Sequence, residues 1–142
     1  MLRNRWMGLV MAWVLVLVSV GCATKTSGAA GSPEDVVTSF YDWLGSVEGS
    51  VLGSKAYRES PYLDRAMVDR VDELVASFEA QPGGGYDPFI CAQDRPSEIV
   101  VTDAEVTGEQ ARVTMQGWNP IHVDLLLTNG TWLITDITCT FP

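Results

Sequence analysis

The stretch QARVTMQGWNPIHVDLLLTNGTWLITDIT, residues 110–138, decides the fold of this chain. Apolar and polar residues alternate along it, which is the period of a strand with one buried face. The apolar members of the alternation are Ala111, Val113, Met115, Ile121, Val123, Leu125 and Leu127. Asn129-Gly130 between two such runs is typical of a two-residue hairpin turn. The stretch therefore predicts strands over residues 110–117, 120–128 and 131–138.

Two further features complete the expected sheet. A strand over residues 98–107 comes first, and Gly108-Glu109 separates it from the next one. In the last strand Trp132 and Ile134 share a face, whereas Ile137 breaks the alternation, which predicts a bulge or a bend. We expect the four strands to form a curved antiparallel meander.

Two amphipathic helices are predicted upstream of the sheet. Ser32-Pro33, followed by two acidic residues, begins a helix over residues 33–47. Ser60-Pro61 begins a second helix by the same logic, and Gln81-Pro82-Gly83 ends it. A loose connection rich in glycine and serine joins the two. Two helices followed by strands predict an α+β domain with both helices packed on one face of the sheet.

The first residues of the chain form an export signal. Arg3 and Arg5 precede an apolar run from Trp6 to Val18, which describes a signal peptide over residues 1–21. This run is shorter than the roughly 20 apolar residues of a membrane-spanning helix. Gly21-Cys22 resembles a bacterial lipobox, in which Cys22 becomes the lipidated first residue of the mature protein. Ordinary cleavage after Ala23 and an uncleaved anchor are the alternatives.

The expected mature chain has two parts. Residues 22–31 are small and polar and predict a flexible tether, and residues 32–142 form one globular domain. We expect a lipoprotein held by Cys22 and facing the periplasm or the cell exterior. It would lie at the outer membrane in a cell with two membranes.

The net charge of the chain excludes one class of binding partner. The chain has 18 acidic and 9 basic side chains, a net charge of −9. Two of the basic residues lie in the leader, so residues 22–142 carry 7 basic and 18 acidic side chains, a net charge of −11. Such an excess of acid argues against nucleic-acid binding, which needs a basic surface.

Cys91 and Cys139 are the only cysteines after Cys22. Export places them in an oxidising compartment, where such a pair is expected to form a disulfide. The alternative is two free buried thiols.

The segment Tyr86–Pro96, YDPFICAQDRP, is the most distinctive in the chain. Together with FYDWL at 40–44 and GTWLITDI at 130–137, it resembles domain of unknown function 3828. That family is typically exported or lipid-anchored in bacteria. The resemblance covers about residues 33–139 and implies a fold like that of nuclear transport factor 2, a cone of helices against a curved sheet. It brings no established catalytic residues.

The same segment supplies the candidate site. Asp87, Gln93, Asp94 and Arg95 are polar residues between two prolines. Polar side chains in such a loop commonly satisfy its backbone, which is the structural interpretation. The functional interpretation places them at the mouth of a pocket.

Other catalytic signals are few. His122 and Asp124 lie on the same strand face, where they would form an acid–base pair or simply face solvent. Trp118 is a candidate anchor for a partner. The sequence shows neither metal-ligand spacing nor a phosphate loop, and we expect no metal and no cofactor.

These features predict a non-enzymatic envelope lipoprotein that binds a protein partner or an envelope ligand. The alternative is a small-molecule pocket protein, or an enzyme resembling isomerases or hydrolases. In that case Asp94 and His122 are the acid–base candidates.

Overall fold

The structure is a computed structural model and describes residues 31–80 and 85–141. The expected signal peptide, Cys22 and all of the tether before Gly31 lie outside the described residues. In the part of the chain that is described, no helix is both long and apolar enough to cross a membrane.

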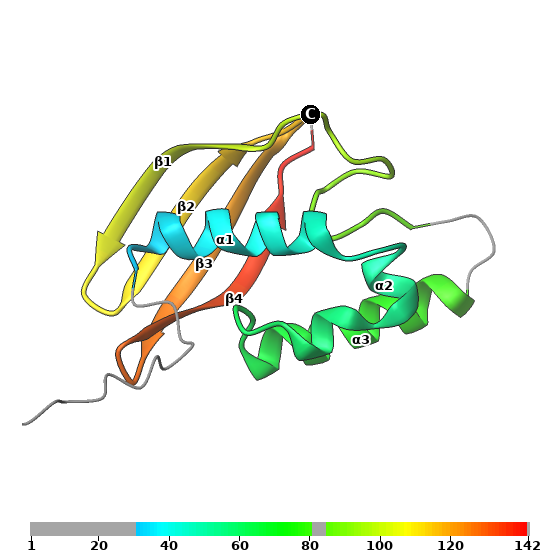
Figure 1. Cartoon of the computed structure of the whole chain (residues 1–142), viewed down its shortest axis with the longest axis horizontal. Helices are drawn as coiled ribbons and strands as arrows, with labels where there is room; N and C mark the ends of the chain where they lie inside the picture. The colour runs from blue at the N-terminus through cyan, green and yellow to red at the C-terminus, as the bar shows by residue number, and fades with distance from the viewer. Residues whose placement is uncertain (1–30, 81–84, 142) are drawn as a thin grey trace, which may run out of the picture.

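The domain is α+β, with helices before a four-stranded antiparallel sheet (Figure 1). The helical elements are α1 (Pro33–Ser46), α2 (Val51–Ser54), the 3-10 turn η1 (Ala56–Glu59) and α3 (Arg65–Ala80). The strands are β1 (Val100–Thr107), β2 (Gln110–Gln116), β3 (Pro120–Thr128) and β4 (Thr131–Cys139).

The strands follow one another across the sheet in the order β1-β2-β3-β4, each antiparallel to the next. The predicted meander is thus confirmed, with every strand boundary within two residues of its expected position. Asn129 and Gly130 both have positive φ, 51° and 79°, as a hairpin turn of this length requires.

A bulge in β4 confirms the break in alternation at Ile137. Asp124 pairs with Asp136 and Leu125 pairs with Ile134, so Thr135 is an extra residue with no partner on β3. The extra residue lets both Ile134 and Ile137 pack on the core face. It also turns Asp136 to the opposite, open face of the sheet.

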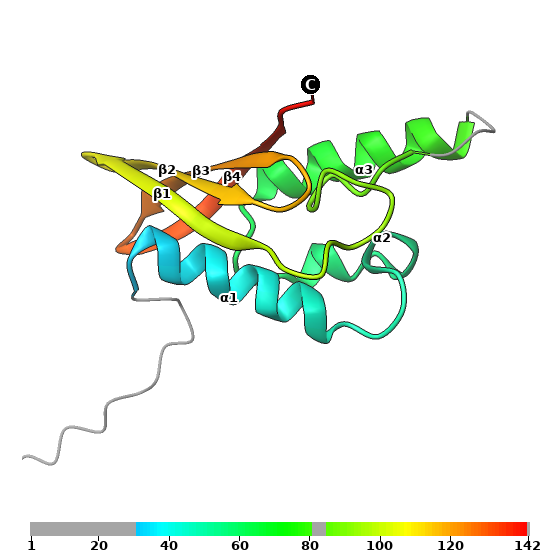
Figure 2. The same ribbon diagram turned by 90° about the horizontal axis from the view of Figure 1, so that it is seen from above.

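Helix α1 lies across the core face of the sheet (Figures 1 and 2). Ser32 and Asp35 form a capping box, in which each side chain accepts a hydrogen bond from the other's backbone N–H. The buried apolar residues of this helix are Val36, Val37, Phe40, Tyr41 and Leu44. They cover the buried strand residues, so the space between helix and sheet is a filled apolar core.

The second long helix, α3, does not begin at the predicted position. It begins at Arg65 rather than after Ser60-Pro61. Asp64 is its cap, because the Oδ1 atom of Asp64 accepts a 2.7 Å hydrogen bond from the Met67 N–H. The residues before it pair with β4 instead: Ile134 donates to Tyr62 O and accepts from the Asp64 N–H. The Tyr62 carbonyl and the Asp64 N–H are thus hydrogen-bonded to β4, so the segment before Arg65 cannot be helical.

The arrangement of the helices also differs from the expectation. Only α1 lies over the face of the sheet, whereas α3 lies beside β4 at its edge (Figure 2). The short elements α2 and η1 occupy part of the segment expected to be a loose connection. The likeness to nuclear transport factor 2 stays a prediction.

The structure joins Cys91 and Cys139 in a disulfide, with their Cα atoms 5.4 Å apart. Cys91 belongs to the buried run Phe89–Cys91, which adds to the core, and Cys139 ends β4. The bond therefore holds the loop that closes one end of the core against the sheet.

We expect the variant Cys91→Ser/Cys139→Ser to lower the free energy of unfolding by about 2–4 kcal/mol. The bond spans 48 residues of sequence, and its loss increases the entropy of the unfolded chain. Urea unfolding of the oxidised protein and of the variant measures the difference. Dithiothreitol should lower the stability of the native protein and leave that of the variant unchanged. Two free thiols per unreduced molecule would contradict the bond.

Candidate functional site

The loop around Asp87 is held together by its own backbone and by one carboxylate. The Oδ1 atom of Asp87 accepts a 2.8 Å hydrogen bond from the Phe89 N–H, and its carbonyl accepts from Ile90 and Cys91. Its own N–H donates to Ala92 O at 2.9 Å. This side chain therefore organises a tight turn, as the structural interpretation of the segment proposed.

The first helix fastens the same turn from within the core. The hydroxyl of Tyr41 donates a 2.6 Å hydrogen bond to Phe89 O. Burial, helped by the nearby charge of Asp87, raises the pKa of Tyr41 well above its usual value. The phenol is consequently a permanent donor that satisfies a buried carbonyl.

The other loop candidates are placed differently. Gln93, Asp94 and Arg95 are exposed, and none of them lines either of the two cavities described below. A methyl group added to Gly45 would lie 3.1 Å from Nη1 of Arg95, so the guanidinium rests on the last turn of α1. A cation there interacts favourably with the helix dipole. The structure thus gives Arg95 a contact with α1.

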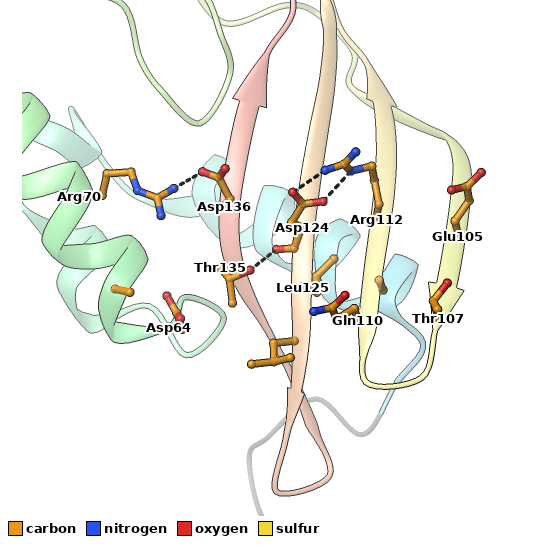
Figure 3. A pocket seen from close by; sticks show the side chains of 13 residues that line it. Asp64, Arg70, Glu105, Thr107, Gln110, Arg112, Asp124, Leu125, Thr135 and Asp136 are labelled. Carbon is orange, nitrogen blue, oxygen red and sulfur yellow. Dashed lines mark hydrogen bonds and ion pairs between the residues drawn. The ribbon is translucent and has the colours of Figure 1, made fainter.

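The larger cavity lies on the open face of the sheet, beside the start of α3 (Figure 3). Its volume is about 600 Å³. Its polar lining comes from all four strands and from α3. The charged lining residues are Asp64, Arg70, Glu105, Arg112, Asp124 and Asp136.

Most of these charges form one row across the sheet. Glu105, Arg112, Asp124 and Asp136 are successive partners in the strand register. Arg70 on α3 forms an ion pair with Asp136 and extends the row beyond β4 (Figure 3). The row is the site's central feature, and we call it the charged row.

Arg112 and Asp124 form its best-defined pair. The Nε and Nη2 atoms of Arg112 donate to the two carboxylate oxygens of Asp124 at 2.7 and 2.8 Å. This hydrogen bonding, together with the charge of Asp124, raises the pKa of Arg112. A bidentate hydrogen-bonded ion pair of this kind fixes the orientation of both side chains.

Of the two interpretations of His122 and Asp124, the structure does not show the acid–base pair. His122 lies on the open face as predicted, but its Nδ1 atom is 3.1 Å from Oγ1 of Thr114. Asp124 is held by Arg112 instead. Within the described residues, no group of three histidine, cysteine, aspartate or glutamate residues is placed to hold a metal ion.

A second cavity of about 360 Å³ lies between α3 and the loop before Cys91. Its apolar lining includes Leu74, Tyr86 and Phe141, and the last of these is 53% exposed. Trp118, between β2 and β3, is 60% exposed and is free to contact a partner.

Sequence reasoning missed Arg70, Glu105, Arg112 and Asp136 as site residues. The sequence held a signal for one of these residues: the break in alternation at Ile137 places Asp136 on the same face as Asp124. The contribution of Arg70 could not be read from the sequence, because it depends on where α3 lies.

Comparisons with known proteins identify structural relatives only. No protein-family model matches the chain, and no curated protein is significantly similar to it. Two crystal structures of the type VI effector-immunity complex Tae3-Tai3 from Ralstonia pickettii do contain a similar chain. In the native complex that chain is 25% identical to this one, with a TM-score of 0.56. The match covers 78% of this chain and 96% of the other. In the selenomethionine complex the identity is 29%, the TM-score 0.57 and the coverages 78% and 98%.

We expect Tyr41→Phe to lower the free energy of unfolding by about 1–3 kcal/mol, because it leaves the buried Phe89 carbonyl without a donor. Tyr62→Phe is the matched control, since among the described residues the Tyr62 hydroxyl forms no hydrogen bond. Chemical unfolding of both variants measures the effect. Equal losses in the two would mean that the hydrogen bond to Phe89 contributes nothing.

We expect Asp87→Asn to gain stability relative to the native protein as the pH rises. Burial raises the pKa of Asp87 above its usual 3.8, so this group stabilises the fold fully below pH 3.8. That contribution is lost as the pH rises through the raised folded-state pKa. The variant keeps the acceptor for Phe89 and should therefore gain stability relative to the native protein between pH 3.5 and 7. Thermal unfolding at both pH values tests this, with exposed Asp94→Asn as control; parallel pH profiles of native protein and Asp87→Asn would refute it.

Proposed function

We propose that this protein is an immunity-type lipoprotein of the bacterial envelope, which binds a toxic effector protein and neutralises it without catalysis. The observation that supports this most directly is the likeness to a chain of the Tae3-Tai3 effector-immunity complex. That match spans nearly the whole of the other chain, so it concerns a complete domain. Since the similar domain occurs in a complex of two proteins, the match supports the proposal that this chain binds a protein partner.

The contacts of the open sheet face favour binding over catalysis. Arg112 holds Asp124 by two hydrogen bonds, and Thr114 contacts His122. His122 and Asp124 therefore do not contact each other and are not placed to exchange a proton. A charged surface of this type is suited to recognition.

The proposed location rests on the leader and on the cysteines. A lipid on Cys22 would hold the domain in the envelope, where an exported effector would meet it. The disulfide between Cys91 and Cys139 suits such an oxidising compartment.

A second candidate function is the binding of a small polar molecule. The cavity of about 600 Å³ that contains Asp124 favours it, since ligand sites are commonly of this size.

Mass spectrometry of the mature N-terminus tests the anchor. We expect a lipid-modified Cys22 as the first residue, and Cys22→Ser should release the protein from membranes. An unmodified N-terminus at Thr24 would contradict the lipoprotein proposal and leave the effector proposal to its own test.

Crosslinking of the full chain in intact envelopes tests the partner. We expect to recover one secreted protein whose export to the periplasm of a host bacterium is toxic. Co-expression of the full chain should restore growth, whereas a chain that starts at Cys22 and stays in the cytoplasm should not. Recovery of no specific partner, or of one whose toxicity the chain leaves unchanged, would contradict the proposal.

A further inference from the structure

We propose that the disulfide between Cys91 and Cys139 is a redox-sensitive latch on the smaller cavity, of about 360 Å³. In the oxidised form it holds the end of β4, residues 139–141, against the loop of residues 86–91. Reduction by a dithiol releases the end of β4 and opens the cavity, while the rest of the domain stays folded. This inference goes beyond the proposed function and does not depend on it.

The loop is the fixed side of the latch. Phe89 is fully buried, and its ring lies edge-on to Phe40 of α1 with 5.6 Å between the ring centroids. The Tyr41 hydroxyl, on the same helix, donates to the Phe89 carbonyl. The Cys91 N–H donates to Asp87 O at 2.9 Å, and Cys91 is 1% exposed. None of these contacts involves the disulfide, so the loop keeps its place on α1 when the bond is broken.

The end of β4 is the movable side. Cys139 is the last residue of β4 and pairs with Ile121, and the Thr140 N–H donates to Pro120 O at 3.2 Å. On the outer edge of β4, the described residues supply backbone partners only at Ile134. Apart from the disulfide, backbone hydrogen bonds therefore hold the end of this strand from one side only. A strand end held in this way opens locally, without unfolding of the core.

The same strand end forms part of the wall of the smaller cavity. Cys139 and Phe141 lie in the lining together with Leu74 of α3. Phe141 is 53% exposed, and its ring contacts Tyr86 with 5.5 Å between the centroids. One aromatic pair holds the segment far less firmly than a covalent bond does. Movement of residues 139–141 after reduction therefore opens the cavity.

The reducing step is thiol–disulfide exchange with a dithiol. One thiolate of the dithiol attacks Sγ of Cys139, which belongs to the cavity lining, and the S–S bond breaks. The electron pair of that bond goes to Sγ of Cys91, which takes up a proton. The second thiolate of the dithiol then displaces Cys139, which also takes up a proton, and the dithiol becomes a disulfide. Oxidation by a disulfide oxidant reverses both steps and closes the latch, as export to an oxidising compartment would.

Amide hydrogen exchange of the full chain in non-ionic detergent, with and without dithiothreitol, tests the latch. We expect the Thr140 amide to exchange about tenfold or more faster in the reduced protein, at a rate that low concentrations of urea leave unchanged. The amides of Val113 and Val123, in the two central strands, should still exchange only through unfolding of the whole domain, which urea accelerates.

The variant Cys91→Ser/Cys139→Ser is the matched control for the reductant. Without dithiothreitol it should exchange like the reduced native protein, and dithiothreitol should leave it unchanged. Alkylation of the reduced native protein with iodoacetamide shows which side moves, when each cysteine is followed by peptide mass spectrometry. Cys139 should react about tenfold faster than Cys91, because the loop keeps Cys91 buried.

Four results would overturn the inference. They are Thr140 exchange that reduction leaves unchanged, Thr140 exchange that depends on urea as steeply as that of Val123, alkylation of Cys91 at least as fast as that of Cys139, and loss of protection throughout the sheet on reduction. The second and fourth would mean that the bond stabilises only the domain as a whole. None of these measurements uses a partner protein, so their outcome is separate from that of the proposed function.

Discussion

The extra residue in β4, Thr135, is the constraint on which both faces of the sheet depend. β4 must supply Ile134 and Ile137 to the core, and three residues apart they cannot share a face of a regular strand. The bulge resolves this conflict and sends Asp136 to the open face beside Asp124. The same strand pairs through Ile134 with the segment before α3, which fixes where that helix starts and brings Arg70 to Asp136. One inserted residue thus connects the packing of the core with the composition of the charged cavity.

The most distinctive segment of the sequence serves the fold. Asp87 organises a turn, Tyr41 holds it from the core, and the bond from Cys91 to Cys139 ties it to the end of β4. Polar residues in a buried loop need partners for its backbone, and those partners are what Asp87 and Tyr41 provide. The hydrogen bonds of Asp87 and Tyr41 therefore account for these two residues through the fold.

The open face, by contrast, looks ordinary in the sequence. Its charged residues are scattered over more than 60 positions, from Arg70 to Asp136. The sheet register and the position of α3 bring them into one row, where opposite charges hold one another in place. A surface row of alternating charges of this kind is suited to electrostatic recognition, which is consistent with the proposed function.

The sequence by itself determined the strands, the hairpin turns, the first helix and the presence of a bulge near Ile137. These features depend on local alternation and on the φ angles that particular turn residues allow, so neighbouring residues are sufficient to specify them. Only the tertiary structure decided that α3 begins at Arg65, lies beside β4 and contributes Arg70 to the open face. It also decided that Asp124 contacts Arg112 rather than His122. Those outcomes depend on which distant groups the folded chain brings within hydrogen-bonding distance, and no local pattern carries that information.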